Sequence, residues 1–184
     1  MQYPAEDARP RRVSQAVVSR AHEAMRPMTL EPLGPLHTLH PGDVVCAERG
    51  DRFETLLGSC VAIVLTDPRR TVGAMCHIVH ANRAVIGTPE TGAYAEVALD
   101  TMYALLRERG IDPTQCEAYV YGGGNMFPEL FTDAHVGERN ARWALDALAQ
   151  DAVRVLFHDL GGQAYRRLSW TVGPEAPQVT AVPV

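Results

Sequence analysis

The sequence predicts a layered domain of the α/β or α+β class. Short apolar runs rich in β-branched residues are separated by two segments in which apolar residues recur at helical spacing. The elements follow the order strands, helix, strand, helix, strands, and no internal repeat is evident. The chain has 184 residues, of which 46% are apolar, and this is enough for one domain with a real core.

Charge and cysteine content narrow the functional classes. The net charge of −5 argues against nonspecific binding to nucleic acid. All 17 basic residues are arginine, which excludes Schiff-base chemistry on lysine. The four cysteines form no CxxC pair, as is usual in a reducing compartment. No secretory signal pattern opens the chain and no apolar run is long enough to span a membrane, so we expect a cytoplasmic protein without membrane insertion.

The start of the chain differs in composition from the rest. Residues 1–38 are rich in Pro and Arg and are expected to form an N-terminal extension, partly disordered, ahead of a domain at 39–184. Within the extension, Ser14–Met25 has one apolar stripe and could form a short helix. The prolines that follow it break any longer element.

The remaining segments are assigned by periodicity and by turn residues. The spacing predicts helices over Gly92–Arg109 and Glu138–Gln150. Phe53–Leu57 is expected to lead into a hairpin, and Ala81–Gly87 to be a loop or an edge segment. Strands are expected at Val44–Ala47, Leu57–Leu65, Val72–Val79, Ala118–Tyr121, Val153–Phe157, Arg166–Val172 and Gln178–Val182.

The expected strands Leu57–Leu65 and Val72–Val79 form a candidate β-hairpin that contains potential catalytic residues. A turn at Asp67–Arg70, centred between Pro68 and Arg69, would place Cys60 directly opposite His77. A thiol beside an imidazole is what a cysteine nucleophile with a histidine base requires. A one-residue slip would put the two on opposite faces. The expected Cys60 face also carries Ala62, Val64, Met75 and Gly73, and the other carries Val61, Ile63, Leu65, Ala74 and Cys76.

Neighbouring residues support a catalytic interpretation of Cys60. A lone cysteine in an apolar strand is usually inert core, but the pairing with His77 changes that balance. Gly58 and Ser59 come just before it, where backbone N–H groups can converge on an oxyanion. Thr55 is the nearest upstream hydroxyl and could fix the tautomer of the base. Pairing with imidazolium would lower the pKa of Cys60 and make it the most reactive thiol.

A zinc site is the rival interpretation of the same segment. Cys60, Cys76, His77 and His80 are ligand types that zinc accepts. Adjacent residues of a strand point to opposite faces, so Cys76 and His77 cannot share a metal. We therefore expect no metal.

A glycine-rich loop follows the strand at Ala118–Tyr121. It lacks the Lys-Ser/Thr ending of a phosphate-binding loop. We interpret it as a backbone bend near the active site, in which Gly123, Gly124 and Asn125 approach the substrate closely.

Several motifs, taken together and in order, resemble the chemoreceptor glutamine deamidase family CheD. The similarity extends from about Leu39 to Val172, which is most of the chain. The segments that carry it are Thr55–Ala62, Asp67-Pro68, Val72–His77, Tyr121–Phe127, Val136–Asn140 and Leu160–Gly162 with Arg166. The family usually continues past the histidine with Leu-Pro, whereas this chain reads Ile78–Ala81, so the loop Asn82–Glu90 is expected to meet substrate differently.

The resemblance implies a fold and a function. The fold would be a β-sandwich-like α/β domain with flanking helices, similar to the catalytic domain of cytotoxic necrotizing factor. Cys60 would be the nucleophile, His77 the base and Thr55 the supporting hydroxyl, and the reaction would use no cofactor. The substrates would be glutamines of methyl-accepting chemotaxis receptors, with glutamate methyl esters open to the same route, and the phosphatase CheC would be a partner. The alternative is a non-catalytic chemotaxis adaptor that binds receptors or CheC.

Overall fold

The computed structural model describes residues 33–82, 91–130 and 135–182. The helix expected at Ser14–Met25 and most of the loop expected at Ala81–Gly87 lie outside the described residues. A compact unit begins at Pro32. Its first strand, β1 (Leu36–Thr38), falls inside the predicted extension 1–38, so the last residues of that extension belong to the folded unit.

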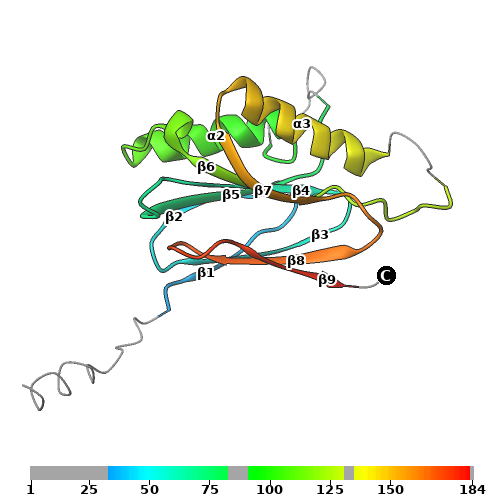
Figure 1. Ribbon diagram of the computed structural model, residues 1–184, viewed down its shortest axis with the longest axis horizontal. Coiled ribbons are helices and arrows are strands. Elements are labelled where there is room, and N and C mark those ends of the chain that lie inside the picture. Colours follow the sequence, from blue (N-terminus) through cyan, green and yellow to red (C-terminus); the bar gives the residue numbers. More distant parts are fainter. Residues whose placement is uncertain (1–32, 83–90, 131–134, 183–184) are drawn as a thin grey trace, which may run out of the picture. The chain divides into compact units, whose positions relative to one another are not determined.

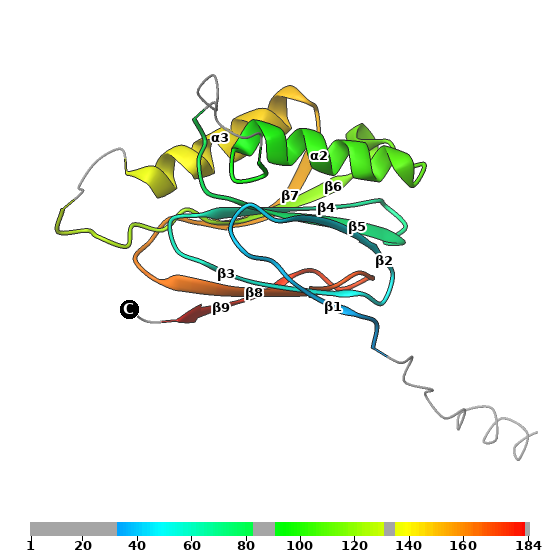
Figure 2. The same ribbon diagram turned by 180° about the vertical axis from the view of Figure 1, so that it is seen from behind.

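Two sheets are stacked face to face, and both long helices cover the outer face of one of them (Figures 1 and 2). This confirms the α+β, sandwich-like class. None of the described helices is both long and apolar enough to cross a membrane. The four-stranded sheet has the order β1, β3 (Arg52–Leu57), β8 (Tyr165–Thr171), β9 (Gln178–Val182). The five-stranded sheet has the order β2 (Val44–Glu48), β5 (Val72–Ile78), β4 (Val61–Thr66), β6 (Glu117–Gly122), β7 (Arg154–Leu160).

Strand directions are mostly antiparallel, with one parallel pair at an edge of each sheet. β1 runs parallel to β3, and β7 runs parallel to β6 with a register irregularity at Ala118/Tyr119. The predicted strands and helices are present within a few residues of their expected bounds. The exception is Phe53–Leu57, which belongs to β3 in the opposite sheet rather than to the approach of a hairpin.

The core has two layers, and β4 and β5 contribute to both. Val61, Ile63 and Leu65 face the helices, whereas Ala62 and Val64 face the four-stranded sheet. Both strands are fully buried, which explains why they read as continuous apolar runs without alternation. The two faces predicted from the period of a strand are confirmed.

The predicted register of this hairpin is wrong by two residues. His77 pairs with Ala62, and the ladder ends at Val61 and Ile78, so Cys60 lies outside β4 and not opposite His77. The reason is the turn. The Asp67 carboxylate accepts hydrogen bonds from the backbone N–H groups of Thr71 and Val72 at 2.7 and 2.8 Å, which makes a longer loop than a turn centred at Pro68–Arg69. A shift of two residues leaves the faces unchanged, and only the cross-strand partner differs.

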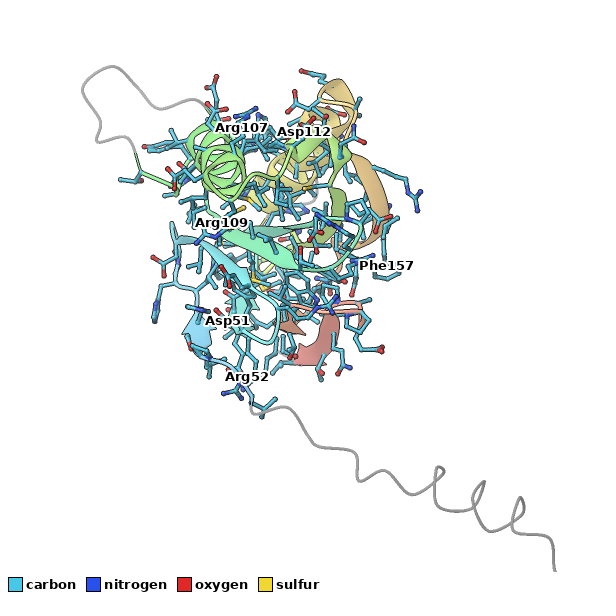
Figure 3. The ribbon with its side chains drawn as sticks, turned by 90° about the vertical axis from the view of Figure 1, so that its left-hand side faces the viewer. Asp51, Arg52, Arg107, Arg109, Asp112 and Phe157 are labelled. Carbon is cyan, nitrogen blue, oxygen red and sulfur yellow. The ribbon has the colours of Figure 1, made fainter. Side chains whose placement is uncertain are left out.

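The helices are α2 (Ala95–Glu108) and α3 (Val136–Gln150), with a short 3₁₀ turn at Pro113–Gln115. α2 packs on β5 and β2, and α3 packs on β6, β4 and β7. Arg109, just past the end of α2, lies beside the five-stranded sheet (Figure 3) and donates to the carbonyl of Cys46 in β2 at 3.1 Å.

The start of α3 lies directly against the glycine-rich loop. A Cβ atom on Gly137 would come within 2.5 Å of the backbone of Gly123, so neither position has room for a side chain. Gly123 also has a φ of +66°, a conformation that favours glycine. The glycine-rich loop is therefore a close backbone contact between β6 and α3.

Candidate active site

Cys60 lies where the chain crosses from one sheet to the other. β3 ends at Leu57 in the four-stranded sheet and β4 begins at Val61 in the five-stranded sheet. The carbonyls of the three connecting residues all accept hydrogen bonds. Gly58 and Cys60 accept from the N–H groups of Gly124 and Gly123, both at 2.8 Å, and Ser59 accepts from the side chain of Asn140 at 3.1 Å. These bonds hold the connection, here called the nucleophile loop (Gly58–Cys60), in one conformation.

The N–H groups of this loop are the candidates for an oxyanion site. Within the described part of the chain, the N–H groups of Ser59 and Cys60 donate no hydrogen bond that the structure shows. The hydrogen bonds shown for these three residues all involve their carbonyls. The Gly58 N–H likewise donates no hydrogen bond that the structure shows among the described residues, and a Cβ atom at Gly58 would lie 2.9 Å from the ring of Tyr165.

His77 and Thr55 meet across the interior of the sandwich. His77 belongs to β5 and Thr55 to β3 of the other sheet, and both are almost fully buried. The Thr55 Oγ1 atom lies 2.8 Å from His77 Nδ1 and 2.9 Å from the carbonyl oxygen of Leu39. The predicted site therefore draws on both sheets and on the segment that follows β1.

These two hydrogen bonds determine the tautomer of His77. A threonine hydroxyl has one hydrogen, and the Leu39 carbonyl can only accept it. Thr55 Oγ1 must then accept from His77, which places the imidazole proton on Nδ1. The Nε2 atom is left as an acceptor, and it is buried without a hydrogen-bond partner among the described residues, Cys60 included. An unpartnered buried acceptor of this kind is costly, and it suits a general base.

One pocket brings the three predicted catalytic residues together. Cys60, His77 and Thr55 line a cavity of about 360 Å³. Cys60 is half-buried and packs on the core between the sheets. The floor of the pocket is buried, whereas Glu54, Leu56 and Arg167 on its rim are exposed. The remaining lining residues are Thr38, Leu39, His40 and Pro41.

Burial keeps both reacting groups neutral. It lowers the pKa of His77 below its ordinary 6.5, although hydrogen bonding at Leu39 and the charge of Asp43 act in the opposite direction. Burial also raises the pKa of the Cys60 thiol. The expected lowering of the Cys60 pKa is wrong, because no imidazolium or other cation offsets the desolvation. Both shifts favour the neutral thiol and the neutral imidazole over an ion pair.

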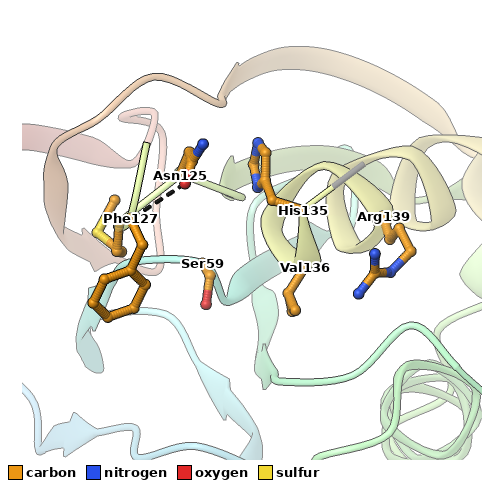
Figure 4. Close-up of a pocket in the computed structure, with 8 residues that line it drawn as sticks. Ser59, Asn125, Phe127, His135, Val136 and Arg139 are labelled. Carbon is orange, nitrogen blue, oxygen red and sulfur yellow. Dashed lines mark hydrogen bonds between the residues drawn. The ribbon is translucent and has the colours of Figure 1, made fainter. Parts of the chain in front are cut away.

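A second pocket lies beside Ser59 of the nucleophile loop and the start of α3 (Figure 4). It has a volume of about 250 Å³ and is lined by Ser59, Gly124 and Asn125 from the predicted set, with Met126, Phe127, His135, Val136 and Arg139. Asn125 accepts a hydrogen bond from the N–H of Phe127 at 3.1 Å. Ser59 and Cys60 are consecutive but line different pockets, and the predicted residues Gly58 and Gly123 line neither of the two.

The rival zinc interpretation needs Cys76 and His77 at one site, but these two side chains lie on opposite faces of β5. Cys76 belongs to the core beneath the helices, whereas His77 faces the other sheet. Within the described ranges, no three His, Cys, Asp or Glu side chains gather as a metal-binding group.

Two groups at this site were not predicted. The Leu39 carbonyl is a backbone atom, and no residue type could have indicated it. Asn140, which is buried in α3, carries a weak signal, because asparagine is a poor residue for a helix interior.

The pocket holds a half-buried thiol, an imidazole and a hydroxyl within one two-sheet α+β domain. Nucleophilic catalysis by a cysteine uses groups of these kinds.

Comparisons with known proteins identify the family. The family model CheD, described as CheD chemotactic sensory transduction, matches residues 81–175. The chain is 35% identical over 133 residues to the probable chemoreceptor glutamine deamidase CheD of Pseudomonas syringae pv. syringae, covering 71% of this chain and 75% of the relative. It is 36% identical over 138 residues to the probable chemoreceptor glutamine deamidase CheD 2 of Albidiferax ferrireducens, covering 73% and 80%. The chain belongs to the CheD family.

A more distant relative and one solved structure were also found. The probable chemoreceptor glutamine deamidase CheD of Methanococcus vannielii is 32% identical over 125 residues, covering 68% of this chain and 81% of the relative. The crystal structure of a Neisseria meningitidis protein matches with a TM-score of 0.44 and 13% identity, covering 71% of this chain and 65% of that one.

Proposed function

We propose that this protein is a cysteine-dependent deamidase that converts glutamine side chains of methyl-accepting chemotaxis receptors to glutamate. The names of its relatives support the reaction and the substrate class. The observation that carries the assignment of residues is the tautomer of His77. Thr55 and Leu39 direct the proton to Nδ1, so that a buried, unpartnered Nε2 remains in the pocket that Cys60 lines.

The first half of the reaction forms a thioester. Cys60 turns its thiol toward His77, its proton moves to Nε2, and the sulfur attacks the amide carbon of the substrate glutamine. The N–H groups of Ser59 and Cys60 bind the oxyanion, an effect of about 3–4 kcal/mol for each donor. The imidazolium then gives its proton to the amide nitrogen, the carbon–nitrogen bond breaks, and ammonia leaves.

The second half restores the enzyme. Neutral His77 takes a proton from water while the water oxygen attacks the thioester carbon. Collapse of this intermediate breaks the carbon–sulfur bond, releases glutamate and returns the proton to the Cys60 sulfur. A glutamate methyl ester can follow the same route with methanol as the first leaving group. Thr55 keeps the ring in place through both halves, because its hydroxyl is held by the Leu39 carbonyl.

Substrate contacts are proposed on both sides of the nucleophile loop. Gly124 and Asn125 in the second pocket would contact the receptor next to the reacting glutamine, with Gly123 supporting their backbone. A glutamine on a helical bundle can reach Cys60 because the rim of the catalytic pocket is exposed. Binding to CheC stays a prediction from the family resemblance.

Mass spectrometry of a receptor cytoplasmic fragment tests the proposal. Incubation with the wild-type protein should convert glutamines to glutamates, and the Cys60→Ala variant should convert none. Cys46→Ala is the matched control, because Cys46 is also a half-buried free thiol but lies in β2, outside the catalytic pocket. Conversion by Cys60→Ala would overturn the nucleophile. Tight binding of the fragment without any conversion by the wild-type protein would favour the adaptor.

A further inference from the structure

Asn140 is a buried amide near the start of α3, and its amide nitrogen and oxygen both form hydrogen bonds. Its Nδ2 atom donates to the carbonyls of Ser59 at 3.1 Å and Val79 at 2.9 Å. Its Oδ1 atom accepts from the N–H of Ala81 at 2.8 Å. Only 1% of the residue is exposed. Two donors and an acceptor are thus spent on backbone groups from two separate segments.

These two segments are the ones that carry the reacting groups. Ser59 directly precedes Cys60, and Val79 follows His77 by two residues. The ladder between β4 and β5 ends at Val61 and Ile78, so it does not reach either of the segments that Asn140 holds. The side-chain amide of Asn140 therefore joins the nucleophile loop to the segment after β5, beyond the end of the β4–β5 pairing.

Other bonds to the nucleophile loop do not perform this task. Gly123 and Gly124 donate to the carbonyls of Cys60 and Gly58, but they follow β6 and bond only the nucleophile loop, not the segment after β5. Among the described residues, Asn140 is the side chain that bonds both the nucleophile loop and the chain leaving β5.

We infer that Asn140 is a positioning residue that sets the distance between the Cys60 thiol and His77 Nε2. This inference rests on the proposed function, because it assigns Asn140 a role in the reaction of that pair. The thiol and the imidazole share no hydrogen bond in the structure, so their approach depends on how firmly the two segments are held. A misplacement of about 1 Å between reacting groups can lower a rate about 100-fold.

Kinetics on the receptor fragment form the first arm of the test. Asn140→Asp keeps the size and the acceptor but replaces the donor group by an oxygen that faces two carbonyls. Asn140→Ala removes the bonds without this repulsion and serves if the first variant folds poorly. We expect kcat to fall about 10–100-fold with KM nearly unchanged, in samples shown to be folded.

Thr66→Val is the matched control for a lost buried hydrogen bond. Thr66 is fully buried in β4 at the far end of the same hairpin, and its hydroxyl donates to the carbonyl of Val72 at 2.9 Å. This variant should lose stability but keep kcat. An Asn140 variant that keeps kcat, or loses no more of it than Thr66→Val does, would overturn the inference.

Alkylation of Cys60 by iodoacetamide forms the second arm and needs no substrate. His77→Ala should slow this alkylation on the order of tenfold in the wild-type background, because the base is lost. In the Asn140→Ala background the same change should have little effect, since the pair is already separated. Equal slowing in both backgrounds would overturn the positioning role of Asn140 but would leave the Cys60–His77 pair in place. No slowing in either background would overturn the Cys60–His77 pair and the positioning role with it.

Discussion

The two ends of the β4–β5 hairpin differ in how their buried polar groups are hydrogen-bonded. At the turn, the buried carboxylate of Asp67 accepts four hydrogen bonds, from the N–H groups of Arg69, Thr71 and Val72 and from the Thr71 hydroxyl. At the other end, His77 Nε2 is equally buried and has no partner among the described residues. Buried polar groups in folded proteins almost always have hydrogen-bond partners, so an exception such as His77 Nε2 needs an explanation.

The pKa values follow the same division. Burial acts to raise the pKa of Asp67, but the hydrogen bonds from Val72, Thr71 and Arg69 together outweigh it and hold the pKa below its usual value. Around His77 and Cys60, burial wins and favours the neutral forms. The turn therefore stabilises a charged group, whereas the end of the hairpin near His77 and Cys60 favours neutral groups.

The largest effect that would test this comparison is loss of the Thr55 hydroxyl. Thr55→Val keeps the shape but removes the acceptor for His77 Nδ1, so the ring can rotate or change tautomer. We expect kcat to fall on the order of 100-fold, and Thr55→Ser, which restores the hydroxyl, to recover most of it. The measurement is the initial rate of deamidation. If Thr55→Val keeps the wild-type rate, the hydroxyl does not orient the base.

A substitution of Asp67 in the turn should lower the stability of the protein without lowering kcat. Asp67→Asn removes the charge that four hydrogen bonds stabilise, and we expect the free energy of unfolding to fall by about 2–3 kcal/mol. Urea denaturation measures this change. Because the folded pKa of Asp67 is lowered, the contribution is present at neutral pH and is lost as pH falls through that pKa. The folded variant should retain wild-type kcat, and a large loss of kcat would show that the two ends are coupled.

The pH dependence of activity gives a smaller effect with a defined sign. His77 must be neutral to act as the base, and its pKa lies below 6.5. The value of kcat/KM should therefore rise with pH at a midpoint below 6.5 and stay level through neutral pH, because the Cys60 pKa is raised and the thiol remains protonated there. A midpoint above 6.5 would show that the charge of Asp43 outweighs the effect of burial on the pKa of His77.

Deletion of residues 1–31 should have the smallest effect, since the compact unit begins at Pro32. We expect the stability and kcat of the shortened protein to match those of the full chain. A deletion through residue 40 is the informative contrast, because it removes β1 and the Leu39 carbonyl that holds Thr55. That protein should lose activity even if it remains folded. A deletion of residues 1–38, which ends at the domain boundary expected from the sequence, should also be harmful because it removes β1.

Most secondary-structure elements of the described residues could be predicted from local sequence alone, with β1 and the sheet to which Phe53–Leu57 belongs as the exceptions. Successive side chains of a strand point to opposite faces, and this rule assigned each residue of Val61–Leu65 to the correct face. Helical spacing located α2 and α3. The motifs around Cys60 and His77 were sufficient to indicate the family. These features are local, because they depend on residues a few positions apart along one chain.

The partners within the site, in contrast, depend on the tertiary structure. Periodicity gives a face but not a register, and the register differs from the prediction because the Asp67 carboxylate builds a longer turn. Nothing near Thr55 indicates that it belongs to a different sheet from His77, since strands of both sheets have similar patterns. The Leu39 carbonyl and the Asn140 amide contribute through contacts between distant segments. Such contacts depend on how the two sheets and α3 pack together, and no short stretch of sequence carries that information.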